Sequence, residues 1–185
     1  MQQLSPEEII KSFEELVEHA WRGNGRYDKT FFTSQHGQKP LGSRLFEAIA
    51  RLSVNVAFEA VCLRRNKKTK AIEVFMIKRG PHESFPDQWH VPGAVFRPGE
   101  KPKDVAHRLS VKEFGADIIS DFKCHGTFFV PEERGWFLSL VYLVRCKKDF
   151  VNEGVWWDVK KLPKNTVQHH LKSVIPSAVK AFGKY

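Results

Sequence analysis

Residues 90–116 read HVPGAVFRPGEKPKDVAHRLSVKEFGA and join a glycine- and proline-rich turn to a charged segment. The stretch Lys103–Phe114 has helical periodicity, and Gly115 follows directly as an expected helix end. A glycine turn before a helix often holds phosphate or metal, because its backbone groups approach the ligand closely. The helix nevertheless carries Leu109 and Lys112 where a metal site favours carboxylates. The segment therefore predicts a turn–helix site that is poor in acids.

The hydrophobic period changes along the chain. Residues 5–20 and 43–52 show helical spacing, and the Gly-, Gln- and Ser-rich residues 22–42 are typical of a loop. The later segments alternate as strands do. We predict strands at Val54–Leu63, Ile72–Lys78, 122–130, 135–146 and 154–159, a hairpin loop at PEERG, and a last helix at 168–182. The chain then divides into an N-terminal helical extension, residues 1–52, and an α/β domain, residues 53–185, with helices packed on a mixed sheet.

Composition favours a globular protein with an anionic small-molecule partner. Of 185 residues, 42% are hydrophobic, and 30 Lys and Arg against 21 Asp and Glu give a net charge of +9. Solubility explains this charge as well as function does. There is no long Lys/Arg block to indicate nucleic-acid binding, and no apolar stretch suits a membrane span. The N-terminus MQQLSPEEII does not resemble a secretion signal, and three cysteines without a CxxC pair suit a reducing compartment, so we expect a cytoplasmic protein.

The turn and helix resemble the Nudix box, whose pattern is G-x5-E-x7-R-E-U-x-E-E-x-G-U, with U aliphatic. With the first glycine of the pattern aligned on Ala94, the matching positions are Glu100, Arg108, Glu113 and Gly115. Features common around Nudix boxes are also present: Trp89, Val91-Pro92-Gly93, Pro98-Gly99, Trp156 and Leu162-Pro163. The resemblance covers about residues 53–182 and implies a Nudix-like α/β/α sandwich with a mixed β-sheet.

The box also departs from the pattern, at Ala94, Leu109, Ser110 and Lys112. A Leu directly after the Arg, with one later Glu, resembles the variant box of GDP-mannose mannosyl hydrolases, in which water attacks the sugar carbon. That branch has a Lys-Arg pair on the strand before the box, and Lys78-Arg79 is similarly placed. The resemblance thus implies a nucleoside diphosphate derivative as substrate, with a nucleotide-sugar such as GDP-mannose as the leading candidate.

The same resemblance implies Mg²⁺, or Mn²⁺, as cofactor. Its ligands would be the Ala94 carbonyl, Glu113 and a residue before the late Trp, with Glu100 as a further ligand or a support behind the site. The branch also has a histidine base before that Trp, but this sequence reads FVNEGV there. Glu153 is the acid in that segment, and we treat it as a third ligand or base, or equally as a turn residue.

The remaining box residues have more than one interpretation. Arg108 is expected to orient carboxylates through charge-assisted hydrogen bonds, and Leu109 to join the core. Lys112 either extends into solvent, which we favour, or contacts a phosphate. Lys78 and Arg79 are candidate phosphate contacts or exposed strand charges. The catalytic candidates are therefore Glu113, Glu153 and Arg108, and the substrate-binding candidates are Lys78, Arg79 and Lys112.

Several residues outside the box are also candidates. His90 is expected in the core, and at most one of His169 and His170 is expected to face a pocket, because neighbouring helical residues point apart. Glu132 and Glu133 belong to a hairpin loop that could overhang the site, but we favour solvated loop acids. Aromatic residues that could stack on a base or belong to the core are Trp89, Phe85 and Phe129.

Two functions fit these observations. One is a Mg²⁺-dependent hydrolase of a nucleoside diphosphate linked to another group. The other is a nucleotide-binding or regulatory module that has the Nudix fold without hydrolysis, because two helix acids of the pattern are missing. The apolar face of the 5–20 helix must be buried on its own domain or on a second copy, so a homodimer is one of two alternatives.

Overall fold

A computed structural model describes residues 5–21, 50–81, 83–97, 99–132, 135–146 and 154–183. Within these ranges the strands are β1 (Val54–Arg65), β2 (Ile72–Lys78), β3 (Trp89–His90), β4 (Gly93–Val95), β5 (Ile118–Ile119), β6 (Cys124–Glu132), β7 (Gly135–Cys146) and β8 (Val155–Asp158). The helical elements are α1 (Pro6–Trp21), α3 (Pro102–Leu109), the π-helical turns η1 (Ser110–Phe114) and η2 (His170–Val174), and α4 (Ile175–Phe182).

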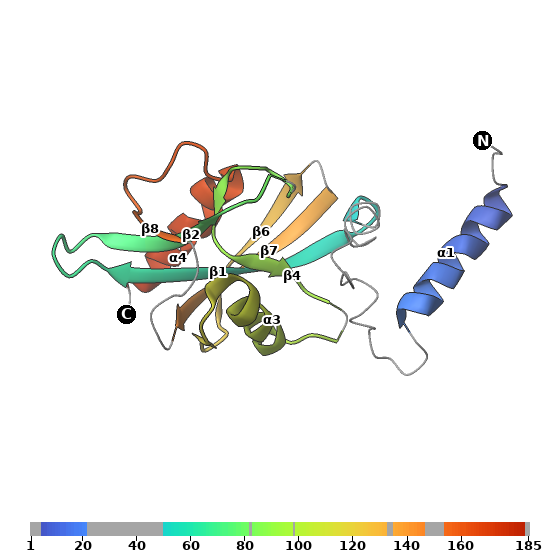
Figure 1. Cartoon of the computed structure of the whole chain (residues 1–185), viewed down its shortest axis with the longest axis horizontal. Helices are drawn as coiled ribbons and strands as arrows, with labels where there is room; N and C mark the ends of the chain where they lie inside the picture. Colours follow the sequence, from blue (N-terminus) through green and yellow to red (C-terminus); the bar gives the residue numbers. More distant parts are fainter. Residues whose placement is uncertain are drawn as a thin grey trace.

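Strand β1 is the centre of a mixed sheet (Figure 1). It pairs in parallel with β7, from Val54 opposite Trp136 to Cys62 opposite Val144, and antiparallel with β2 and β4. Strands β6 and β8 extend the sheet antiparallel to β7 and β2. The predicted long strands are confirmed, and β2 and β7 have their predicted bounds. The short strands β3, β4 and β5 are additions.

Two hydrophobic cores cover the two faces of this sheet. Seven consecutive residues of β1, positions 57–63, are buried, as expected for a central strand covered on both sides. Phe58, Ala60 and Cys62 pack in one core with helix α3, whereas Val61 and Leu63 pack in the other with α4. Figure 1 shows α3 and α4 on opposite sides of the strands. The predicted α/β/α sandwich is therefore confirmed.

The box helix is not a regular α-helix to its end. Helix α3 passes into the π-helical turn η1, and Gly115 ends it with a left-handed φ of 61°. Leu109, the last residue of α3, is 1% exposed and belongs to the same core as Val105, as predicted. Ser110, another departure from the box, donates to the Ala106 carbonyl and accepts from the Ile118 N–H. Two of the four departures thus have structural roles.

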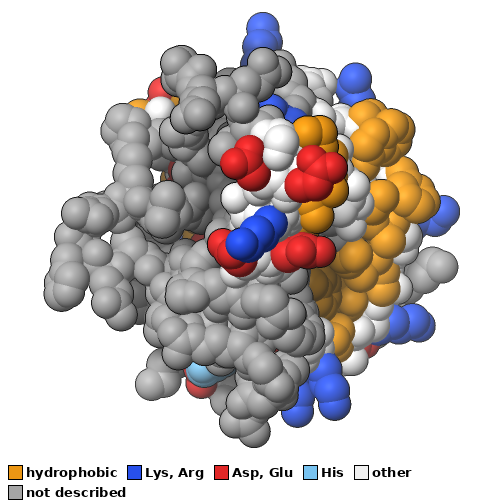
Figure 2. All heavy atoms as spheres, turned by 90° about the vertical axis from the view of Figure 1, so that its right-hand side faces the viewer, with side chains coloured by type: hydrophobic (Ala, Val, Ile, Leu, Met, Phe, Trp, Pro, Cys, Tyr) orange, Lys and Arg blue, Asp and Glu red, His pale blue; other side chains and the backbone are white. Residues whose placement is uncertain are grey.

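The N-terminal extension is described only in part. Helix α1 has its predicted position, and the predicted helix at 43–52 lies almost entirely outside the described residues. Ile9, Ile10 and Phe13 on α1 are about half exposed, at 55%, 57% and 47%. Figure 2 looks at this end of the molecule and shows acidic side chains beside exposed hydrophobic ones. None of the described helices has the length and apolar character needed to cross a membrane.

Candidate functional site

A cavity of about 290 Å³ opens where the box turn meets the central strand, and we call it the box cavity. Strand β4 contributes the backbone of Gly93 and Ala94 to its wall. Charged and titratable residues make up much of the rest: Glu59, Arg79, His90, Arg108, Glu132, His169 and His170. Six segments that are distant in the sequence therefore place ionisable groups around one space, which is the usual composition of a binding or catalytic site.

Gly93 lies between two carboxylates. Its N–H donates to Glu113 Oε2 at 3.3 Å, and in the sheet it is the register partner of Glu59 on β1. A Cβ atom at position 93 would lie 2.7 Å from Glu59 Oε2, closer than any real contact of this kind. The glycine is therefore needed for the close approach of Glu59 rather than for an unusual φ angle.

Glu113 is the box acid whose chemistry is most altered. Burial raises its pKa to about 7, although the hydrogen bond from Gly93 and the charge of Arg79 oppose this rise. Such a carboxyl group exchanges protons near neutral pH, which a solvated glutamate does not. The structure thus places Glu113 against Gly93 of the box turn, although Glu113 itself is outside the cavity lining.

Glu100 and Arg108 form an ion pair that braces the turn. Arg108 Nη2 and Nε contact the two carboxylate oxygens at 2.7 and 3.1 Å, and Nη2 also donates to the Val95 carbonyl at 3.0 Å. The Arg97 N–H donates to the same carboxylate at 2.8 Å. Burial opposes ionisation of Glu100, but these hydrogen bonds outweigh it and lower its pKa. Both oxygens of Glu100 are thus engaged within the turn, and Arg108 holds that carboxylate.

The other candidates are spread around the cavity or lie away from it. Arg79 lines the cavity, with its guanidinium 3.9 Å from Glu83. Lys78 instead pairs with the exposed Asp87 at 3.0 Å and is outside the cavity lining. Lys112 is exposed on η1 and is also outside that lining, in agreement with the favoured prediction that it extends into solvent. Glu153 lies outside the described residues.

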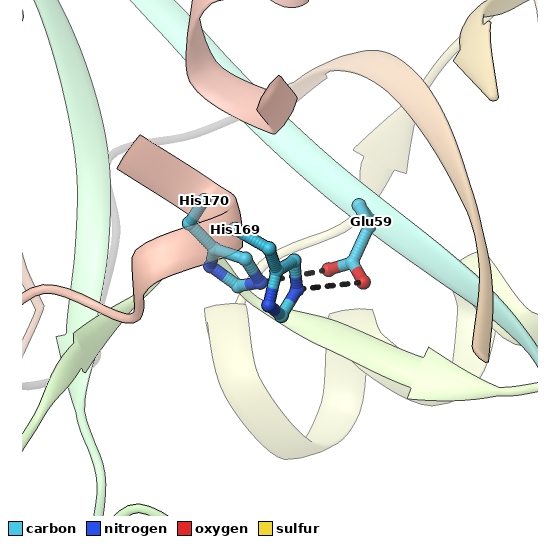
Figure 3. A group of neighbouring side chains, drawn as sticks. All are labelled: Glu59, His169 and His170. Atoms are coloured by element: carbon cyan, nitrogen blue, oxygen red, sulfur yellow. Dashed lines mark ion pairs between the residues drawn. The ribbon is translucent and has the colours of Figure 1, made fainter. Parts of the chain in front are cut away.

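The histidine pair behaves differently from the prediction. Both His169 and His170 face the cavity, with their rings 4.2 Å apart and perpendicular. Their Nε2 atoms lie 4.0 and 3.5 Å from the two carboxylate oxygens of Glu59 (Figure 3). The expectation that at most one ring faces a pocket was wrong, because the pair lies where the helix starts and passes into the π-helical turn η2 rather than in a regular helix.

Hydrogen bonding fixes the tautomer of His170. The Val91 N–H donates to its Nδ1 at 3.1 Å, so the proton of the neutral ring lies on Nε2 and faces Glu59. Burial holds the pKa of His170 well below its usual value, and burial, aided by the charge of Arg79, lowers the pKa of His90 to about 3. Both rings are therefore neutral at physiological pH. His90 is 6% exposed, as expected of a packed histidine.

Glu132 also differs from the expectation of a solvated loop acid. Strand β6 continues to Glu132, which pairs with Gly135, and its side chain is only 6% exposed. Its Oε1 atom lies 3.5 Å from His169 Nδ1. Glu132 is thus a strand residue rather than a loop residue, and it belongs to the cavity.

A second pocket of about 660 Å³ adjoins the box cavity and shares Glu132 and His169 with it. We call it the aromatic pocket, because Phe85 and Phe129 line it and Phe129 is 68% exposed. Trp89 does not line this pocket; it packs edge-on against Trp157, with ring centroids 5.4 Å apart, in the core beside α4.

Glu59 was not among the residues predicted for the site. It is the one acid in the strand VNVAFEAVCLRR and is 5% exposed, and the Ser139 hydroxyl donates to its Oε1 at 3.0 Å. A charged residue inside a run of buried apolar residues is rarely found without a specific role. That position in the run was the signal that could have identified it.

Comparisons with known proteins agree with this architecture at the level of the fold. No protein-family model and no curated protein sequence matches the chain. Solved structures that do match include the C. elegans Ap4A hydrolase, at 19% identity over 70% of this chain and 98% of that one, with a TM-score of 0.55. The NUDIX domain of Shewanella oneidensis NrtR, complexed with ADP ribose, matches at 18% identity over 70% and 89%, with a TM-score of 0.53.

A NUDIX hydrolase from Nitrosomonas europaea matches in the same way, at 12% identity over 71% of this chain and 90% of that one, with a TM-score of 0.55. At these identities the likeness is one of three-dimensional arrangement. It establishes the Nudix fold for the chain, which confirms the predicted fold class. A shared fold does not determine function, which depends on the residues of the site.

Proposed function

We propose that the protein binds a nucleoside diphosphate derivative in the box cavity and hydrolyses it. The observation that carries this proposal is the meeting, in one cavity, of the box turn, a cationic side chain and several acid–base groups. Arg79 would contact the phosphates, since guanidinium groups recognise phosphate oxygens in a bidentate manner. The net charge of +9 favours the same class of ligand.

The two pockets together suit a ligand with a phosphate part and an aromatic part. The diphosphate would lie in the box cavity, and the nucleobase would lie in the aromatic pocket against Phe129 or Phe85. Aromatic side chains stack on any base, so this arrangement accommodates more than one nucleotide. ADP-ribose, which the structure of the NrtR domain contains, Ap4A, and nucleotide-sugars such as GDP-mannose are the first compounds to test.

Glu113 is the proposed carboxylate ligand of a divalent cation. Its pKa of about 7 without an ion means that the cation competes with a proton for this carboxylate at neutral pH. Gly93 fixes one of its oxygens against the turn, and Arg108 acts at a distance by holding Glu100 and the Val95 carbonyl. Arg108 is thus a positioning residue.

The box contains few side chains that could bind a divalent cation. Glu100 is engaged by Arg108 and Arg97, which leaves Glu113 as the box carboxylate, among the described residues, that could hold Mg²⁺ together with the Ala94 carbonyl. Mg²⁺ commonly relies on one or two carboxylates, several waters and substrate phosphates, so these residues suffice only with the substrate present. The ion would neutralise phosphate oxygens and orient water.

The alternative is a module that binds the nucleotide without hydrolysing it, which the loss of helix acids at Leu109 and Lys112 favours. We would measure thermal stabilisation and nucleotide release for the three compound classes above, with Mg²⁺ and with Mn²⁺. The hydrolase proposal predicts turnover that Glu113→Gln abolishes while ligand-induced stabilisation is retained. Stabilisation without turnover would replace it with the binding module, and the absence of both would refute the assignment of the cavity.

A further inference from the structure

His169 lies between two carboxylates. Its Nε2 is 4.0 Å from Glu59 Oε1, and its Nδ1 is 3.5 Å from Glu132 Oε1. The ring can satisfy both carboxylates in two ways. Either each nitrogen carries a proton, or one nitrogen donates its proton while the lone pair of the other binds a cation that lies between it and the second carboxylate.

The distances indicate which nitrogen faces that cation. Nδ1 is the nitrogen nearer to a carboxylate, at 3.5 Å from Glu132 Oε1, so we assign the N–H to Nδ1, whereas Nε2 lies 4.0 Å from Glu59 Oε1, well beyond hydrogen-bond length. The same gap suits a metal ion, because ligand atoms about 2.0–2.2 Å from an ion lie roughly 3–4 Å apart. A carboxylate on the far nitrogen of a metal-bound histidine is a recurrent arrangement that fixes the ring.

We infer that Glu59 and His169 form a binding site for a divalent transition-metal ion, separate from the box acids. Glu59 would supply Oε1 and His169 would supply Nε2, with water or a phosphate oxygen in the remaining positions. The imidazole ligand favours Zn²⁺, Fe²⁺ or Ni²⁺ over Mg²⁺, which prefers oxygen ligands. His169 is 17% exposed and lines the cavity, so an ion can reach the site from solvent.

His170 supports this site without binding the ion. Its Nδ1 accepts the Val91 N–H, so Nε2 keeps its proton and donates toward Glu59 Oε2 at 3.5 Å. Ser139 donates to the other oxygen at 3.0 Å. Oε1 accepts one hydrogen bond from Ser139 and has a second lone pair with which it can bind an ion. Figure 3 shows how His169 and His170 converge on Glu59 from the start of the last helical segment.

The test uses the metal alone, without nucleotide. Long-range ¹H–¹⁵N spectra resolve both ring nitrogens of each histidine, and we would titrate ¹⁵N-labelled, EDTA-stripped protein with ZnCl₂. We expect the Nε2 resonance of His169 to shift as Zn²⁺ saturates the site, while its Nδ1 stays protonated. The ring of His170 should keep its tautomer. Calorimetry should show loss of this binding in Glu59→Gln and His169→Asn, and a weakening of about 10-fold or more in Glu132→Gln.

Two controls make the result decisive. His107→Asn removes an exposed histidine of α3 and should bind Zn²⁺ like the wild type, and so should Glu113→Gln, which alters the box. The inference is overturned if Zn²⁺ shifts no nitrogen of His169, or if Glu113→Gln abolishes binding while Glu59→Gln retains it. The wild-type spectra decide the first point even where a variant does not fold.

The inference depends on the proposed function only for the use of the ion, which would hold a phosphate oxygen opposite Glu113. Absence of turnover with every nucleotide, together with Zn²⁺ binding at His169, would refute the hydrolase and leave the metal site standing. Turnover of a nucleotide without Zn²⁺ binding at His169 would refute the metal site and leave the hydrolase proposal standing.

Discussion

Neutralising Glu113 should stabilise the fold at alkaline pH, because its burial disfavours the ionised carboxylate. The difference between the ordinary pKa of 4.5 and the value of about 7 corresponds to about 3 kcal/mol, at roughly 1.4 kcal/mol for each unit. The folded state holds this proton more tightly than the unfolded chain does, so the wild type loses stability as pH rises from 4.5 through 7. Glu113→Gln keeps an oxygen for the Gly93 N–H and removes this loss.

The assay is urea unfolding at several pH values between 5 and 8.5, in EDTA, followed by the fluorescence of the five tryptophans. We expect the variant to gain up to about 3 kcal/mol over the wild type by pH 8.5, or about 6–12 °C in Tm, and little at pH 5. Glu100→Gln is the matched control with the opposite sign, because the pKa of Glu100 is lowered and its charge stabilises the fold above pH 4.5. Parallel pH profiles for wild type and Glu113→Gln would refute the assignment of a buried, destabilised carboxyl group.

Two further variants test the construction of the turn. Gly93→Ala should displace Glu59 and lower the free energy of unfolding by about 1–3 kcal/mol, because the added Cβ would lie 2.7 Å from Glu59 Oε2. In Gly80→Ala the added Cβ would meet nothing closer than 3.8 Å, so this variant should lose less than about 1 kcal/mol in urea unfolding. Arg108→Lys should lower the free energy of unfolding by about 1–3 kcal/mol, because it removes the bidentate contact with Glu100. Arg64→Lys affects a half-exposed ion pair with Glu73 and should change this free energy by less than about 1 kcal/mol in thermal unfolding. Equal effects within either pair would contradict the geometry.

The long elements could be predicted from the sequence because each has a clear period. Strand β1 is a nearly continuous apolar run. Strands β2 and β7 are rich in apolar residues, and residues typical of turns flank them, so their bounds could be predicted from neighbouring residues. The short strands β3 and β4 have two and three residues and exist through pairing with β2 and β1. Such pairing depends on tertiary contacts, and a period cannot be read from so few residues.

The site was less predictable for the same reason. The box register identified Glu113 and the Glu100–Arg108 pair, since these lie within one segment. The positions of Glu59 and His169 relative to each other depend on how β1 meets the start of the last helix, more than a hundred residues later. The π-helical turn η2 brings both histidines to the cavity, and no simple sequence pattern predicts such a turn.

Two carboxyl groups from distant parts of the sequence lie against Gly93 at the box turn. Alternate residues of β1 face opposite sides of the sheet, so Phe58 packs beside α3 while Glu59 faces the last helix. Glu113 reaches the Gly93 N–H from η1, and Glu59 occupies the space that the missing side chain of Gly93 leaves. A carboxylate from β1 thus lies at the box turn, beside the one that η1 supplies. Leu109 stands where the box pattern has an acid, and at 1% exposure it belongs to the core instead.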